Sequence, residues 1–111
     1  MQRLSDESLI GICRLNPGLT YLNLTWCLAL TDRGIEEGVC KHLERGLNLL
    51  SLYGNTTVTD KALDALVNTK QHQISLETLD LNGCSGIKAC RRAVEALAEH
   101  FPNCKVFTYH S

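Results

Sequence analysis

Leucines recur in one fixed pattern in three segments of this chain, residues 19–27, 47–55 and 76–84. Each segment reads L-x-x-L-x-L-x-x-(N/C), where x varies. The fourth to sixth positions alternate between apolar and polar side chains, which is the period of a β-strand with one buried face. The segments begin at residues 19, 47 and 76, so the starts lie 28 and 29 residues apart, and a shorter fourth copy begins at Cys104. The pattern therefore predicts one short strand in each of four copies.

The residues between the strands predict a helix in each of the first three copies. Thr31-Asp32 and Thr59-Asp60 are helix-start signals, because either side chain can accept hydrogen bonds from the first free backbone N–H groups. Parallel strands need a crossover connection of this kind. Apolar side chains recur on one side of each predicted helix, and Pro102 ends the third; the inward-facing positions are Ile35, Val39, Leu43, Leu63, Leu66, Val67, Ala93, Val94, Leu97 and Phe101.

A period of 28 or 29 residues with this leucine spacing is typical of leucine-rich repeats. The expected fold class is therefore α/β, a leucine-rich repeat solenoid with a short parallel sheet on the concave face and helices on the convex face. We expect the helical half of a truncated preceding repeat, three leucine-rich repeats and a C-terminal capping strand, at residues 1–18, 19–103 (19–46, 47–75 and 76–103) and 104–111.

The two ends of the expected solenoid differ. Residues 4–6 align with the start of the next helical segment, so the strand that should precede them is missing, and residues 19–24 would form an unprotected sheet edge. We expect either that the chain is the tail of a longer solenoid or that a partner supplies the missing strand. At the other end, Phe107 and Tyr109 are placed in the fourth and sixth positions, where bulky aromatic side chains would close the last coil.

The ninth position of each copy predicts a small interior side chain. Asn55 can donate to and accept from buried peptide groups there, and Cys27 and Cys84 fit the same volume with weaker hydrogen bonds. The six cysteines are expected to be reduced packing residues rather than a disulfide framework, because they fall at repeat positions that suit small buried thiols.

Charge and hydropathy exclude several kinds of partner. The net charge is −1 and no basic stripe is present, so neither nucleic acid nor an anionic membrane surface is expected to bind. No apolar run approaches the roughly 18 residues of a membrane span. The polar first residues lack the apolar stretch of a secretory signal, so a cytoplasmic or nuclear location is expected.

The candidate binding residues lie at the strand positions that point away from the leucines. Aromatic side chains, which often anchor protein contacts, are concentrated there, although strands also favour them for their propensity alone. We expect a protein partner on the concave face, contacted by Tyr21, Asn23, Thr25, Trp26, Ser51, Tyr53, Asp80, Asn82 and His110.

The sequence offers no catalytic constellation. His42, His72 and His100 fall near predicted helix ends, and their spacing to Cys40 and Cys104 matches no paired zinc-ligand pattern. No nucleophile motif or phosphate-binding loop is present. We therefore expect neither an enzyme nor a metal or cofactor.

Cysteine in the ninth position, followed by Thr-Asp after the turn, resembles the cysteine-containing leucine-rich repeats of F-box/LRR proteins. The likeness covers nearly the whole chain and resembles the last repeats of a plant or green-lineage member, at residues 22–27, 50–60, 79–88 and 101–111. The resemblance implies the substrate-recognition subunit of an SCF-type E3 ubiquitin ligase, in which an F-box docks the Skp1 adaptor and the repeats hold the substrate.

The F-box itself has no counterpart in these 111 residues, so contact with a Skp1-type adaptor would require residues outside this sequence. The alternative is a leucine-rich repeat scaffold without an F-box, which bridges partners in a cytoskeletal, ciliary or mitotic-regulatory assembly.

Overall fold

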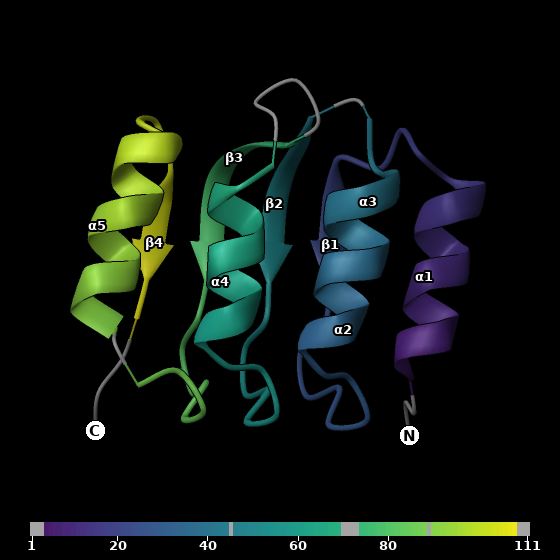
Figure 1. The fold of residues 1–111 in the computed structure, drawn as a ribbon, viewed down its shortest axis with the longest axis horizontal. Helices are drawn as coiled ribbons and strands as arrows, with labels where there is room; N and C mark the ends of the chain where they lie inside the picture. The colour runs from purple at the N-terminus through teal and green to yellow at the C-terminus, as the bar shows by residue number, and fades with distance from the viewer. Residues whose placement is uncertain (1–3, 45, 70–73, 89, 109–111) are drawn as a thin grey trace.

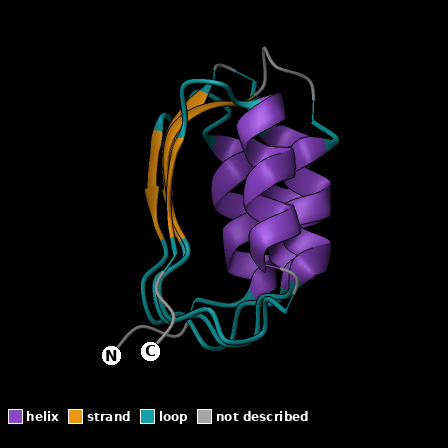
Figure 2. Cartoon of the chain, turned by 90° about the vertical axis from the view of Figure 1, so that its left-hand side faces the viewer, coloured by secondary structure: helices purple, strands orange, loops and turns teal. Residues whose placement is uncertain are grey.

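The computed structural model describes residues 4–44, 46–69, 74–88 and 90–108. The chain forms two layers, a four-stranded sheet and a row of helices that covers one of its faces (Figure 2). The structure is thus mixed α/β, as expected. Its elements (Figure 1) are α1 Asp6–Leu15, β1 Tyr21–Asn23, α2 Asp32–Gly34, the π-helical turn η1 Ile35–Val39, α3 Cys40–His42, β2 Leu47–Ser51, α4 Asp60–Val67, β3 Ile74–Asp80, α5 Cys90–His100 and β4 Lys105–Phe107.

All four strands are parallel and follow one another in chain order, β1-β2-β3-β4. Leu22 pairs with Leu50, and Leu50 pairs with Leu79. The fourth position of the pattern therefore forms one row across three strands, which confirms the predicted alignment of these leucines.

The register of β4 differs from the prediction by one residue. Val106, not Phe107, lies beside Leu79, and Phe107 lies beside Asp80. Because side chains alternate between the two faces of a strand, this shift moves Phe107 from the interior to the surface, where 47% of it is exposed. The prediction that Phe107 occupies an interior leucine position is wrong, because Val106 takes that place and packs against the core. Tyr109 lies outside the described residues.

The core lies between the sheet and the helices. Leu50, Leu52 and Leu79 are fully buried, and such a leucine contributes about 1.5–3 kcal/mol relative to an exposed one. Most predicted inward-facing helix positions are also confirmed. The buried ones are Ile35, Val39, Leu43, Leu63, Leu66, Leu97 and Phe101, whereas Val67 and Val94 are half-buried and the side chain of Ala93 lies outside the described atoms.

The threonine and the aspartate of the Thr-Asp pairs make different hydrogen bonds. Thr31 and Thr59 cap their own helices, accepting from the N–H groups of Arg33 and Lys61. The aspartate instead ties one copy of the pattern to the next: Asp32 accepts from the N–H of Thr59 at 2.7 Å and from its hydroxyl at 2.5 Å. Asp6 binds Thr31 in the same way, at 2.8 and 2.6 Å. The expectation of a local cap therefore holds for threonine, while each of these carboxylates links neighbouring helix starts.

The ninth position joins neighbouring copies inside the core. The Asn55 side chain is fully buried, accepts from the N–H of Cys27 at 2.6 Å and donates to the carbonyl of Leu24 at 2.7 Å. The Cys84 thiol donates to the carbonyl of Leu52 at 2.9 Å. These bonds confirm the role predicted for the ninth position, and every buried side-chain nitrogen or oxygen in the described residues has a partner.

Candidate functional site

The sheet face opposite the helices is here called the outer face (Figure 2). The described residues among those predicted to bind a partner lie on its strands or at the strand ends. Tyr21, Leu49 and Thr78 lie side by side at the third position, one residue before the leucine row. Asn23, Ser51 and Asp80 form the next outward row. Thr25, Trp26, Tyr53 and Asn82 follow at the ends of these strands, and His110 lies outside the described residues.

The polar side chains of the fifth position have a structural task. The Asn23 Oδ1 atom accepts from the Thr25 N–H at 3.1 Å, and the Asp80 Oδ1 atom accepts from the Asn82 N–H at 2.9 Å. Ser51 makes the equivalent, longer bond to the Tyr53 N–H at 3.5 Å. Short polar side chains commonly stabilise turns in this way. These hydrogen bonds within the turns therefore account for the polar side chains of this row, and no binding partner is needed to explain them.

Trp26 has an unusual backbone conformation. Its φ of 60° is the only positive value at a non-glycine residue among those described. The equivalent eighth positions are Gly54 and Gly83, both with φ of 76°. An L-residue in this region costs roughly 1–2 kcal/mol relative to the right-handed conformation, whereas glycine enters it freely. The first copy thus keeps a large aromatic side chain where the turn favours glycine.

The Trp26 indole packs across the neighbouring strand end. A Cβ atom on Gly54 would lie 2.9 Å from the indole Cε3 atom, so the missing side chain of Gly54 makes room for the ring. Trp26 also meets Tyr53 edge to face, with ring centroids 5.8 Å apart and planes 66° apart. Trp26 and Tyr53 remain 61% and 40% exposed. We call this pair the aromatic ridge.

A shallow hollow of about 390 Å³ adjoins the aromatic ridge. Its apolar walls include Tyr53 and Phe107, and Asn82 supplies an amide. Phe107 was missed as an outer-face residue because the fourth copy was assumed to begin at Cys104, one residue too late. The alternation of Cys104 and Val106 fits an outward Phe107, but that of Phe107 and Tyr109 fits the other register equally well, so the sequence alone did not decide between them. The hollow is lined by Tyr53, Asn82, Gly83, Val106, Phe107 and Thr108.

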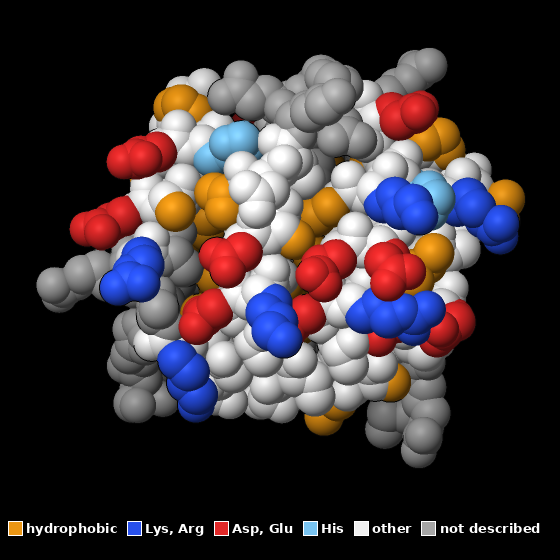
Figure 3. Space-filling view, viewed as in Figure 1, with side chains coloured by type: hydrophobic (Ala, Val, Ile, Leu, Met, Phe, Trp, Pro, Cys, Tyr) orange, Lys and Arg blue, Asp and Glu red, His pale blue; other side chains and the backbone are white. Residues whose placement is uncertain are grey.

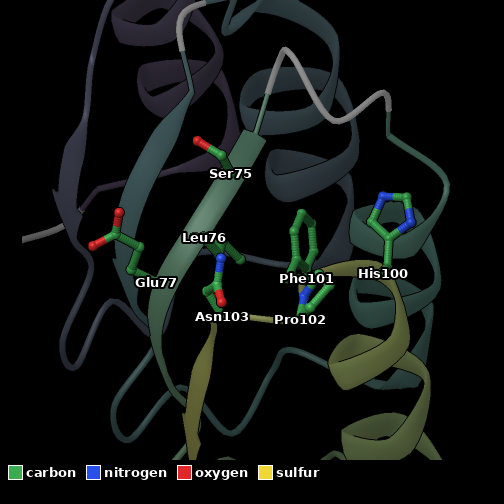
Figure 4. Close-up of a pocket in the computed structure, with 7 residues that line it drawn as sticks. All are labelled: Ser75, Leu76, Glu77, His100, Phe101, Pro102 and Asn103. Carbon is green, nitrogen blue, oxygen red and sulfur yellow. The ribbon is translucent and has the colours of Figure 1, made fainter.

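A second hollow of about 390 Å³ lies between the start of β3 and the end of α5 (Figure 4). His100 lies at its margin, with its Nε2 atom 2.9 Å from the carbonyl oxygen of Thr69 and its ring against Phe101. Figure 4 shows Glu77 on the other side of the hollow, pointing away from His100. The imidazole therefore joins α5 to the end of α4, and no acid–base pair forms here between Glu77 and His100.

The helix layer carries charges of both signs. Figure 3 shows acidic and basic side chains interspersed over this face. Arg33 contacts Glu7 at 2.6 Å and Glu37 at 3.3 Å. The hydrogen bond from Arg33 lowers the pKa of the exposed Glu7 carboxyl. Arg92 is exposed on α5, while the Arg91 side chain lies outside the described atoms. This mixed surface presents no field of one sign to a highly charged partner.

Most of the described cysteines pack against or within the hydrophobic core. Cys13, Cys27, Cys40, Cys84 and Cys104 are free thiols. Burial raises the pKa of Cys13 and Cys104 to about 11 and, with a smaller contribution from Glu36, that of Cys40 to about 12. Within the described residues, no three side chains of the His, Cys, Asp and Glu types gather as a metal-binding group. The helices among these residues include none with the length and apolar character needed to cross a membrane.

A search of protein-family models finds no match to this chain.

Proposed function

We propose that this chain is a leucine-rich repeat solenoid that binds another protein through its outer face. The period of 28 and 29 residues, the parallel strands in chain order and the ninth-position hydrogen bonds between copies support the repeat assignment. In this proposal residues 19–46, 47–75 and 76–103 are the three repeats. The outer face would be the concave binding surface of a larger assembly.

The backbone of Trp26 is the single observation that carries the binding proposal. Backbone strain at an exposed residue suggests a function that the fold itself does not require. Glycine at this position would relieve the strain, as Gly54 and Gly83 do in the next two copies. The indole instead packs edge to face against the Tyr53 ring. Tryptophan and tyrosine are enriched among the residues that contribute most to binding at protein interfaces.

The specific role that we propose is substrate recognition for an SCF-type ubiquitin ligase. The cysteine-bearing ninth position and the Thr-Asp pairs support this assignment through their resemblance to F-box/LRR repeats. The aromatic ridge and the adjoining hollow, whose walls include Phe107, would contact the protein to be ubiquitinated. The Skp1-type adaptor would bind an F-box outside this sequence.

Replacing Trp26 by glycine separates binding from stability. Trp26→Gly removes the indole and suits the positive φ, so the free energy of unfolding should change by less than about 1 kcal/mol, because relief of strain offsets the lost ring contact with Tyr53. Affinity for a protein partner should fall about tenfold or more. Partners captured from cell extract by the wild-type chain can be identified by mass spectrometry and then titrated against both forms by calorimetry.

Arg92→Ala on the helix layer is the matched control and should bind like the wild type. Equal affinity of the Trp26→Gly and wild-type chains would refute the outer-face site. Recovery of the Skp1 adaptor and a cullin with the endogenous protein that carries this sequence would support the ligase role. Recovery of cytoskeletal or ciliary proteins without the adaptor would support the scaffold alternative.

A further inference from the structure

Asp80 carries a charge that its turn does not require. Its Oδ1 atom accepts from the Asn82 N–H at 2.9 Å, and Asn23 and Ser51 supply the equivalent acceptor to their own turns with neutral side chains. A neutral oxygen is therefore sufficient for this hydrogen bond. The Asp80 side chain is only partly buried, and no Lys, Arg or His of the described residues forms an ion pair with it. The charge of Asp80 is thus available to a partner.

Two exposed aromatic rings lie on either side of Asp80. Phe107 is its neighbour on β4, and Tyr53 follows the end of β2 on the other side of β3. Both rings line the hollow beside the aromatic ridge, so they face a common space. Outward side chains that follow one another on a strand are about 7 Å apart, so Asp80 lies at the margin of this hollow, one outward position before Asn82.

Asp80 is the only formal charge near these rings. The described segments at the strand ends contain no other Asp, Glu, Lys or Arg side chain, at residues 23–28, 51–57, 80–85 and 107–108. Lys105 lies further back on β4, beside Thr78, and Glu77 immediately precedes Thr78, so that part of the sheet carries both signs. The face of an aromatic ring is electrostatically negative. The two rings and the carboxylate therefore favour a cation.

We infer that the hollow beside the aromatic ridge binds an arginine side chain of the protein partner. The guanidinium would stack on the ring of Phe107 or Tyr53 and donate to the Asp80 carboxylate. Arginine fits better than lysine, because its planar group stacks on rings, forks onto a carboxylate and is less strongly hydrated. Trp26 would then contact residues that flank the arginine. The inference rests on the proposed function, because it names the chemistry by which a protein partner binds the outer face.

Other side chains fit the hollow less well. An aspartate or glutamate would meet the Asp80 charge and the negative ring faces. An aliphatic side chain would cover the rings but would displace water from the carboxylate and leave it without a partner. An arginine places its aliphatic stem on the apolar walls and its charge on Asp80, so it satisfies both parts of the hollow.

Peptides that differ in one side chain test the inference on the unmodified chain. The probes are alanine pentapeptides, blocked at both ends, with arginine, citrulline, lysine or glutamate at the centre. Citrulline keeps the shape of arginine but has no charge. In an NMR titration, the arginine peptide should shift the backbone amides of Tyr53, Asn82 and Phe107 with a Kd on the order of 1 mM. The amide of Leu66 in α4 should stay unchanged.

The other peptides give the specificity of the hollow. The citrulline peptide should bind about fivefold more weakly than the arginine peptide, because it loses both the ring interaction and the ion pair. The lysine peptide should bind more weakly than the arginine peptide, and the glutamate peptide should not bind.

Asp80→Asn removes the charge and keeps the Oδ1 acceptor that the turn uses. Affinity for the arginine peptide should fall about threefold, while the weak binding of the citrulline peptide should not change. Asp64→Asn is the matched control, because it removes the same charge from an exposed side chain of α4 and should bind like the wild type. Phe107→Ala should also weaken the arginine peptide about threefold, because it removes one of the rings.

Several results would overturn the inference. Equal binding of the arginine and citrulline peptides to the wild-type chain would do so, as would amides that do not shift up to about 20 mM arginine peptide. Equal binding of the lysine and arginine peptides would overturn the choice of arginine. Equal affinities of Asp80→Asn and Asp64→Asn for the arginine peptide would show that the local charge has no role.

Failure of this inference can be told apart from failure of the proposed function. A protein partner whose affinity falls in Trp26→Gly but not in Asp80→Asn would leave the outer face as the binding surface and remove only the arginine site. A partner that binds both variants like the wild type would refute the outer-face site itself.

Discussion

Asn55 is the side chain that connects the first two strands most directly inside the core. Its amide is fully buried and satisfies one donor and one acceptor of the preceding turn, at Cys27 and Leu24. An apolar side chain of similar size could fill the space but could make neither bond. The free energy that Asn55 contributes is therefore mainly that of keeping two buried peptide groups paired.

Replacing Asn55 by leucine should lower the free energy of unfolding by about 1–3 kcal/mol for each peptide group left unpaired. Urea denaturation followed by circular dichroism measures this loss. Asn48→Leu is the control, because the same change there affects an exposed side chain of β2 and should cost little. Similar losses in both variants would show that the buried amide has no special role.

The buried thiols should react slowly and with a strong dependence on pH. Only the thiolate is nucleophilic, and pKa values of about 11 for Cys13 and about 12 for Cys40 leave little thiolate at pH 8. Alkylation by iodoacetamide, followed by mass spectrometry, should be slower in the native chain than in denaturant by about 100-fold at Cys13 and about 1000-fold at Cys40. Similar rates in the two states would contradict the burial of these thiols.

The same pKa shifts set the direction of alkaline destabilisation. Between an unfolded pKa near 9.0 and the raised folded values, the native state holds protons that the unfolded state has lost. Folding stability is therefore fully present below about pH 9 and falls as the pH rises towards 11 and 12. Stability that stays constant across this range would contradict the shifts.

The first strand-end turn illustrates what aligned copies can and cannot predict. The eighth positions read Trp26, Gly54 and Gly83, and this contrast already suggests a turn that prefers glycine. The contact of the indole with Gly54 and Tyr53 depends on the distance between neighbouring turns, which the pattern alone does not give. The sequence therefore suggests a strained turn at Trp26, but it does not predict how the indole packs against its neighbours.

At the scale of elements, the carboxylate ties hold the starts of successive helices in line. Asp32 is at the first residue of α2 and binds Thr59, the residue before α4, through two hydrogen bonds. At the third copy Lys88 replaces threonine, and its N–H donates to Asp60 at 3.4 Å. Each tie therefore positions a helix by way of the helix before it.

Asp32→Ala should lower the free energy of unfolding by about 1–3 kcal/mol, because it removes both acceptors of Thr59. The Thr59 amide should also exchange hydrogen faster, which a loss of helix-dipole interaction at α2 alone would not produce. Asp64→Ala in α4 is the control, since that side chain is exposed. A Thr59 amide that stays protected in Asp32→Ala would contradict the tie.

The strands show where leucine spacing is sufficient to predict an element. In β1, β2 and β3 the spacing predicts the register from the third to the fifth position, because a shift would expose Leu22, Leu50 and Leu79. At the first position the register shifts, and Leu47 lies beside Ile74. The fourth copy has no leucine, so its apolar alternation fits two registers equally well. Val106 takes the interior place because it lies beside Leu79, and Phe107 becomes part of the outer face. The candidate site was therefore incomplete where the leucines end.

At the scale of the whole molecule, a partner on the outer face would contact side chains of several copies. Figure 1 shows that the helices are spread further apart than the strands, so the sheet lies on the narrower side of the molecule.

Among the described residues, the side-chain hydrogen bonds between copies of the pattern join immediate neighbours. Asn55 and Cys84 each reach back one copy, while Asp6 and Asp32 each reach forward one. When the chain is pulled from its two termini, no single one of these hydrogen bonds would therefore hold all the copies together. It should yield in successive steps, each releasing one copy.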